Sequence, residues 1–149
     1  MTRINSAIPV ENLTDEHLLV EQKELKRMPH YLQRYFEKDM MKRMPKKFVL
    51  GRDHVIFFCD KMKFIFNRCL CISAELKRRG LEVEEFASGF RYLQNTEYWN
   101  DYQPTDEERV ILIEKTTSRI MESSKREFHY YGKPITKEEA IKLLQRDEH

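Results

Sequence analysis

The chain has 149 residues, the common size of a single domain, and it is 40% hydrophobic and 35% charged with only four Gly and five Pro. This composition excludes a disordered or fibrous chain and favours a compact helical protein. The N-terminus is polar, and charges interrupt every long apolar stretch, so we predict neither a signal peptide nor a membrane span and expect a cytoplasmic protein.

The net charge of +2 conceals an uneven distribution along the chain. Residues 23–52 contain ten Lys or Arg and three acids, whereas residues 82–108 contain eight acids and a single basic residue, Arg91. If the two segments lie on different faces, the basic face would suit a polyanionic partner. The alternative is a solvated charged surface that has no partner.

Two long helices are expected in the first half of the chain. Thr14, followed by two acids, predicts a helix start, and apolar residues at helical spacing continue that helix to about residue 36. Pro29 is expected to kink this helix unless it ends it. After a basic loop, a second, apolar helix is expected from residue 51 to Gly80, which favours a helix end.

The second half is expected to contain shorter elements. Residues 81–103 predict irregular or short helical structure, and Thr105 with Glu108 predicts a third helix to about residue 123. Thr136 with Glu139 repeats that signature before a short helix, and an aromatic and basic segment ending in a turn lies between the two helices. We therefore predict an all-α protein, a single domain over residues 1–149 with three main helices, irregular connections and a short helical extension over 136–149.

The N-terminus offers a nucleophile. Thr at position 2 is small enough to allow removal of Met1, which exposes an α-amine with an ordinary pKa of about 7.7–8.0. Such an amine is partly neutral at physiological pH and suits attack on a sugar carbon with imine formation. Most chains that begin Met-Thr use this amine for no reaction, so the sequence alone leaves both alternatives open.

One side of the first helix carries titratable groups, namely His17, Glu21, Glu24 and Arg27, since residues three, four and seven apart share a face. This side borders the apolar stripe, and partial burial would raise a carboxylate pKa and suit it to proton transfer. The alternative is that both glutamates form ordinary surface ion pairs with Lys23 or Arg27. Spacing does not choose between Glu21 and Glu24.

Residues 128–133 and His54 are two further candidates for a functional role. The aromatic and basic residues 128–133 suit stacking on nucleobases and contact with phosphate, with a packed C-terminal tail as the alternative. His54 stands at the start of an apolar helix, where a single histidine is usually a structural residue, and we expect that role for it.

Several stretches together resemble one family, the pyrimidine-dimer DNA glycosylases of T-even bacteriophages, also called phage endonuclease V, with their viral and bacterial relatives. The matching stretches are residues 2–5, 13–18, 24–27, 50–51, 54–55, 57–58, 60–61, 76–78 near Gly80, and 130–133. They span most of the chain in order, and this breadth makes the resemblance specific.

The resemblance implies a mainly three-helix protein that acts on double-stranded DNA containing lesions. It implies that the Thr2 amine meets Glu24, which selects Glu24 over Glu21, and attacks the anomeric carbon of the 5′ nucleotide of a cyclobutane dimer. The base is then lost, and the resulting imine permits β-elimination that cuts the strand. No metal or organic cofactor is implied, and we expect a monomer.

The resemblance also implies a set of DNA-binding residues: Arg3, Lys23, Arg27, Lys115, Arg119, Tyr130, Tyr131 and Lys133. Lys23 stands where a relative has Arg, which keeps the charge but loses the bidentate guanidinium. Residues 37–45 and the helix from Thr136 onward depart from the family pattern, so the lesion preference is less defined than the chemistry. The alternatives are the same imine chemistry on another modified base and a non-catalytic binder of distorted DNA.

Overall fold

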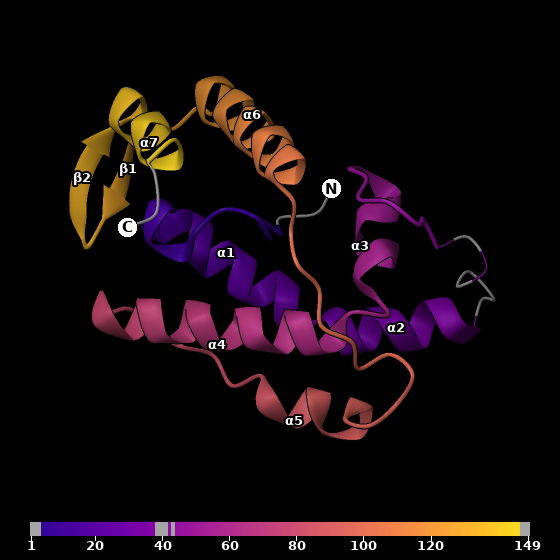
Figure 1. The fold of residues 1–149 in the computed structure, drawn as a ribbon. Helices are drawn as coiled ribbons and strands as arrows, with labels where there is room; N and C mark the ends of the chain where they lie inside the picture. The colour runs from indigo at the N-terminus through magenta and orange to yellow at the C-terminus, as the bar shows by residue number, and fades with distance from the viewer. Residues whose placement is uncertain (1–3, 38–41, 43, 147–149) are drawn as a thin grey trace.

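The computed structural model describes residues 4–37, 42 and 44–146. In chain order its elements are η1 (Val10–Asn12), α1 (Asp15–Lys26), α2 (Met28–Glu37), α3 (Arg52–Phe58), α4 (Met62–Arg78), α5 (Ala87–Phe90), η3 (Arg91–Leu93), α6 (Asp106–Glu122), β1 (Glu127–Tyr130), β2 (Lys133–Thr136) and α7 (Lys137–Leu144) (Figure 1). The structure is mostly helical, and the all-α prediction is confirmed.

The helices α1 and α4 pack side by side at the centre of the molecule (Figure 1). Helix α5 packs against α4, whereas α6, α7 and the hairpin lie on the other side of α1. One cluster of buried apolar residues runs from Ile4 to Leu144 and includes side chains of α1, α4, α6 and α7. In the described part of the chain, no helix is long and apolar enough to cross a membrane.

The predicted helix to residue 36 is two helices, because α1 ends before Pro29. A continuous helix would need an N–H at Pro29 to bond the Leu25 carbonyl, and proline has none. The chain turns at Arg27, whose N–H donates to the Glu24 carbonyl at 3.2 Å, and α2 starts at Met28. The start of α1 agrees with the prediction, since the Thr14 side chain accepts the His17 N–H.

The predicted second helix is also broken, at residues 59–61. The new helix start at Met62 is stabilised from a distance, because its N–H donates to the Tyr98 carbonyl at 2.9 Å. The side chain of Asn100 also donates to the Asp60 carbonyl at 2.8 Å. At the other end Gly80 closes α4 with a φ of +73°, as predicted.

The aromatic and basic segment, which was expected to end in a turn and to contain no strand, forms a small antiparallel hairpin. Its register pairs Glu127 with Thr136 and Tyr130 with Lys133. The two loop residues, Tyr131 and Gly132, have φ values of +54° and +78°, as a type I′ turn requires. A type I′ turn usually has Asn, Asp or Gly at the first of these positions. Because this chain has a tyrosine there, the sequence did not predict a hairpin.

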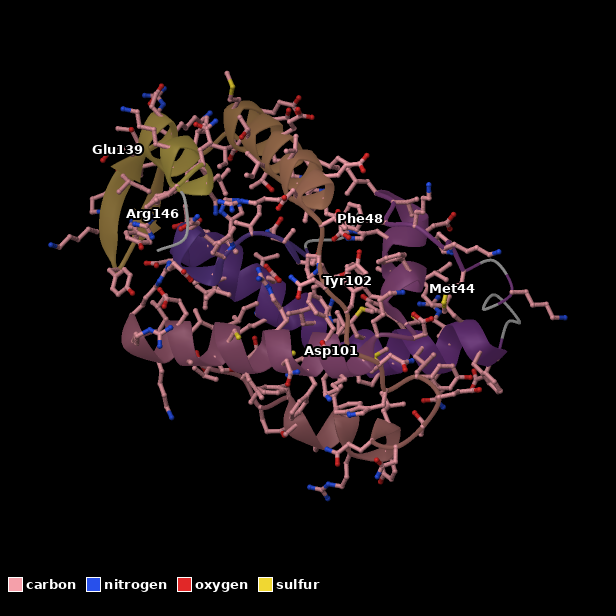
Figure 2. The ribbon with its side chains drawn as sticks, in the orientation of Figure 1. Met44, Phe48, Asp101, Tyr102, Glu139 and Arg146 are labelled. Carbon is pink, nitrogen blue, oxygen red and sulfur yellow. The ribbon has the colours of Figure 1, made fainter. Side chains whose placement is uncertain are left out.

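At the start of α6, Glu108 is a buried carboxylate. The Thr105 hydroxyl accepts the Glu108 N–H at 3.1 Å, while the Glu108 side chain accepts a hydrogen bond from Tyr102 on the connection between α5 and α6 (Figure 2). Its other oxygen, Oε2, is buried without a hydrogen-bond partner. Burial raises the pKa of Glu108 from 4.5 to about 7.

This carboxyl should make stability depend on pH. Between about pH 4.5 and 7 the folded chain holds the Glu108 proton and the unfolded chain has lost it, so the free energy of unfolding falls as the pH rises through this window. We expect Glu108→Gln to remove this part of the dependence, because the amide does not titrate. Urea denaturation of both proteins at pH 4.5, 6 and 8 measures it, and parallel pH curves would disprove the assignment.

Candidate active site

Two buried arginines, one on α4 and one at its C-terminal cap, hold the N-terminal segment (residues 4–14) against the helices. Arg68 donates to the backbone carbonyls of Asn5 and Ile8, each at 2.8 Å. The same guanidinium contacts both carboxylate oxygens of Glu21 on α1, at 2.9 and 3.3 Å, and Glu21 is fully buried. Arg68 therefore joins α1, α4 and the N-terminal segment at one point.

Arg79, three turns further along at the C-terminal cap of α4, makes the same kind of junction. It donates to the Leu13 carbonyl at 2.8 Å and the Val10 carbonyl at 3.4 Å. It also forms ion pairs with Asp15 at 2.9 Å and Glu75 at 2.8 Å. Burial alone would raise the pKa of Glu75, but hydrogen bonds from arginines including Arg79 hold that pKa below its ordinary value.

These contacts fix the direction of the N-terminal segment. Leu13 lies next to Asp15, at the start of α1, and the Asn5 carbonyl shares a guanidinium nitrogen with Glu21, almost two turns further along that helix. Followed backwards from Leu13 to Asn5, the segment thus runs along α1 toward its C-terminal end. The next carboxylate in that direction is Glu24.

Glu24 lies half-buried on the last turn of α1, close to Tyr35 of α2. Burial raises the pKa of the Tyr35 phenol, and the Glu24 carboxylate adds to that rise. Lys23, next to Glu24 on α1, and Arg27, directly after the helix, are exposed. A carboxylate between water and the protein interior with exposed cations beside it suits proton transfer next to a bound anion.

Helix α6 brings two further cations to the N-terminal segment. Thr116 donates from its hydroxyl to the Asn5 side chain at 3.2 Å, and Lys115 and Arg119 lie half-buried on either side of it along the helix. Burial and, to a smaller extent, the charges of Lys115 and Arg119 together lower the pKa of His54 to about 3. His54 packs against Phe48 and Phe58, so it is a neutral structural residue, as expected.

A cavity of about 190 Å³ lies between α1, α6 and the hairpin. Its walls include Asn5 from the N-terminal segment, His17 and Arg119. The His17 ring stacks on Phe128 with a centroid distance of 5.8 Å. Polar and cationic side chains therefore surround Asn5, which lies close to the N-terminus of the chain.

The predicted aromatic site lies at the other end of α1. Tyr131 and Gly132 donate their N–H groups to the Asp15 carboxylate at 3.1 and 2.8 Å. The Tyr131 hydroxyl donates to Glu75, and the Tyr130 ring covers the Arg79 guanidinium. Asp15 is nine residues before Glu24, or about 13 Å along the helix. The structure therefore does not bring Tyr130 and Tyr131 together with Glu24, and Lys133 follows them as an exposed residue.

The other residues singled out in the sequence are Thr2, Arg3, Glu21 and those of the two charged segments. Thr2 and Arg3 lie outside the described residues. The hypothesis that Glu21 forms a surface ion pair with Lys23 or Arg27 is wrong, because Glu21 is buried with Arg68. The acidic and basic segments are not fully separated either, since Lys26 pairs with Glu84 at 3.1 Å.

Sequence reasoning did not identify Asn5 and Arg68 as residues that shape the site. Asn5 occurred only within a stretch that resembles the family, and the residues around it do not indicate its long-range contacts with Arg68 and Thr116. Arg68 carried a usable signal, because it is the one charged residue between Lys63 and Glu75, and it is 91% buried in the structure. A buried arginine needs a carboxylate or several carbonyls, and it has both.

The sequence was also compared with models of known protein families. The sequence profile of the family described as pyrimidine dimer DNA glycosylase matches residues 1–89, which is more than half of the chain. The chain belongs to this family. The matched range includes the N-terminal segment, Glu24 and both anchoring arginines, whereas α6, the hairpin and α7 lie outside it.

Membership in a DNA-repair glycosylase family gives the chain a nucleic-acid partner, damaged DNA, and the resemblance noted from the sequence is confirmed. Among the residues that the structure describes, no three His, Cys, Asp or Glu side chains group in a way that could hold a metal ion.

Proposed function

We propose that this protein is a bifunctional DNA glycosylase and AP lyase that acts on cyclobutane pyrimidine dimers through the α-amine of Thr2. The family match supports the dimer as substrate. The observation that carries the mechanism is the course of the N-terminal segment, which Arg68 holds beside α1 and directs toward Glu24. We also propose that it acts as a monomer.

The reach of the chain supports a meeting of Thr2 and Glu24. Thr2 is three residue steps from Asn5, a distance of at most about 10 Å along the chain. Glu24 follows Glu21 by three residues, a rise of about 4.5 Å along α1, and Glu21 shares its arginine with the Asn5 carbonyl. An amine at position 2 therefore has Glu24 within its range. Its ordinary pKa of about 7.7–8.0 leaves part of it neutral and nucleophilic at physiological pH.

The reaction proceeds in two stages. The Thr2 nitrogen forms a bond to C1′ of the 5′ nucleotide, and the bond from C1′ to the base breaks, with its electron pair leaving on the base. The sugar ring opens, and the nitrogen loses a proton as the imine forms. Removal of a C2′ proton then expels the 3′ phosphate by β-elimination, and water hydrolyses the imine to release the amine.

Glu24 is the group that we assign to the proton transfers. It would protonate the departing base or the sugar ring oxygen and then accept a proton for the elimination. Its half-buried position favours this role over that of Glu21, whose carboxylate is held on both oxygens by Arg68. Glu21 therefore acts as a structural residue of the same site.

We propose that Lys23, Arg27, Lys115 and Arg119, with Arg3, contact the phosphates around the lesion. A dimer already weakens stacking, so kinking the duplex or displacing a nucleotide there costs less than in undamaged DNA. DNA contacts of Tyr130, Tyr131 and Lys133 stay a prediction. The Tyr130 and Tyr131 hydroxyls already donate to Glu11 and Glu75 within the protein.

A duplex oligonucleotide with one thymine dimer at a defined position tests this function. We expect a single cut at the dimer that leaves an unsaturated aldehyde at the 3′ end of one fragment, and no cut in the matched undamaged duplex. Loss of the base without a cut would leave a glycosylase that lacks the lyase activity. Cutting of a different modified base but not of the dimer would contradict the proposed substrate.

Binding to undamaged duplex should weaken steeply with salt, because the cationic residues displace condensed counterions from phosphates. Arg119→Gln should reduce the slope of log affinity against log salt concentration by about 1. The affinity can be measured by fluorescence anisotropy at NaCl concentrations from about 50 to about 200 mM. A slope near zero for the wild type would contradict DNA binding, and an unchanged slope in Arg119→Gln would remove Arg119 from the interface.

A further inference from the structure

The end of α7 contacts the N-terminal segment through Arg146 (Figure 2). Arg146 donates to the Glu11 carbonyl at 3.0 Å and to the Asn12 side-chain oxygen at 3.2 Å. In return the Asn12 amide donates to the Arg146 carbonyl at 2.7 Å, and Asn12 is 1% exposed. The Tyr130 hydroxyl donates to the same Glu11 carbonyl at 2.8 Å. The contact is therefore reciprocal and includes a buried side chain.

Helix α7 is itself held firmly, so it can transmit this contact. A complete capping box between Thr136 and Glu139 fixes its start, and Ala140 and Leu144 are buried in the core. Lys137 donates to the Ser123 carbonyl at 2.7 Å, at the end of α6. Arg146 thus lies two residues beyond a helix that its capping box, α6 and the core hold in place.

Three arginines bind the backbone of the N-terminal segment at different places along its length. Arg68 binds it at Asn5 and Ile8, and Arg79 binds it at Val10 and Leu13. Arg146 binds the backbone at Glu11 and adds a contact to the Asn12 side chain. The first two arginines, on α4 and at its C-terminal cap, belong to the family-matched range, whereas Arg146 lies beyond it. The C-terminal helix, which departs from the family pattern, therefore adds a third point of attachment.

We propose that Arg146 is a positioning residue that holds the N-terminal segment in its register along α1 and so fixes the amine of Thr2 in its attacking position. This inference rests on the proposed function of Thr2. Reaction rates depend steeply on such placement, since a displacement of about 1 Å at the reacting atoms can cost on the order of a hundredfold. Arg146 acts on the amine through the backbone of residues 4–12 and not by touching DNA.

The test compares Arg146→Ala with the wild type in single-turnover trapping by borohydride at saturating enzyme. We expect the trapping rate to fall about tenfold while the Kd for dimer-containing duplex changes less than about twofold. Arg146→Lys keeps one donor for the Glu11 carbonyl and should recover part of the rate. Hydrogen exchange at the amides of residues 5–12 should be faster in Arg146→Ala, which reports the loosened segment directly.

Lys142→Ala is the matched control, because Lys142 is exposed on the same helix and is expected to leave the rate unchanged. If Arg146→Ala folds poorly, Arg146→Lys takes its place and should slow trapping by a smaller factor with unchanged Kd. An unchanged rate, or a rate loss matched by an equal loss in Kd, would overturn the inference. Failure of the proposed function is recognised separately, because the wild-type adduct would then map to a residue other than Thr2.

Discussion

We expect Glu24→Gln to lower strand cleavage of dimer-containing DNA by on the order of a hundredfold or more, the range for a lost general acid–base group. Glutamine keeps the size and hydrogen-bonding reach of the side chain and removes its charge and its titrating proton. Folding and affinity for damaged DNA should largely survive. Single-turnover cleavage assays together with Kd measurements separate the chemical step from binding.

The control for this substitution must be an exposed carboxylate. Glu114→Gln makes the same change on the surface of α6, next to Lys115, and should alter cleavage less than about twofold. Glu21→Gln is unsuitable, because Glu21 forms a buried ion pair with Arg68 and its loss would disturb the N-terminal segment. Normal cleavage by Glu24→Gln would show that another group transfers the protons.

The second large effect concerns stability. Arg68→Met should lower the free energy of unfolding by about 3–5 kcal/mol, because it leaves the Glu21 carboxylate buried without a cation. The carbonyls of Asn5 and Ile8 lose a donor in the same substitution. Urea denaturation measures the loss.

Lys26→Met provides the comparison, since Lys26 forms a surface ion pair with Glu84 and should contribute less than about 1 kcal/mol. A second comparison is the double variant Glu21→Leu with Arg68→Met, which removes both charges and should recover part of the stability. If Arg68→Met is as stable as Lys26→Met, Arg68 does not anchor the N-terminal segment.

Local signals predicted the helix ends well. Thr14, Thr105 and Thr136 each accept the N–H three residues later, and Gly80 adopts the left-handed conformation that closes α4. Each of these interactions lies within four residues of the chain, so the sequence contains both partners side by side. The break between α3 and α4 was missed because its partners, Tyr98 and Asn100, are some forty residues away.

The same distinction applies to the candidate site. Helical spacing placed Glu21 and Glu24 on one side of α1 but could not rank them, because the burial of Glu21 depends on Arg68, which is 47 residues away. The preference for Glu24 came from resemblance to a family. The structure adds a physical reason. Arg68 contacts both carboxylate oxygens of Glu21, whereas Glu24 lies further along α1 in the direction in which the N-terminal segment runs. The role of Arg146 involves a pair 134 residues apart and had no sequence signal.

Borohydride trapping identifies the nucleophile, which we propose to be the α-amine of Thr2. Borohydride reduces an imine formed during turnover to a stable secondary amine, which leaves a covalent protein–DNA adduct. Protease digestion and mass spectrometry then locate the linked residue. We predict that the adduct maps to the N-terminal peptide, at Thr2, in protein that lacks Met1, and that N-terminal acetylation abolishes it. An adduct on the side chain of a lysine, or an undiminished adduct after acetylation, would contradict this account.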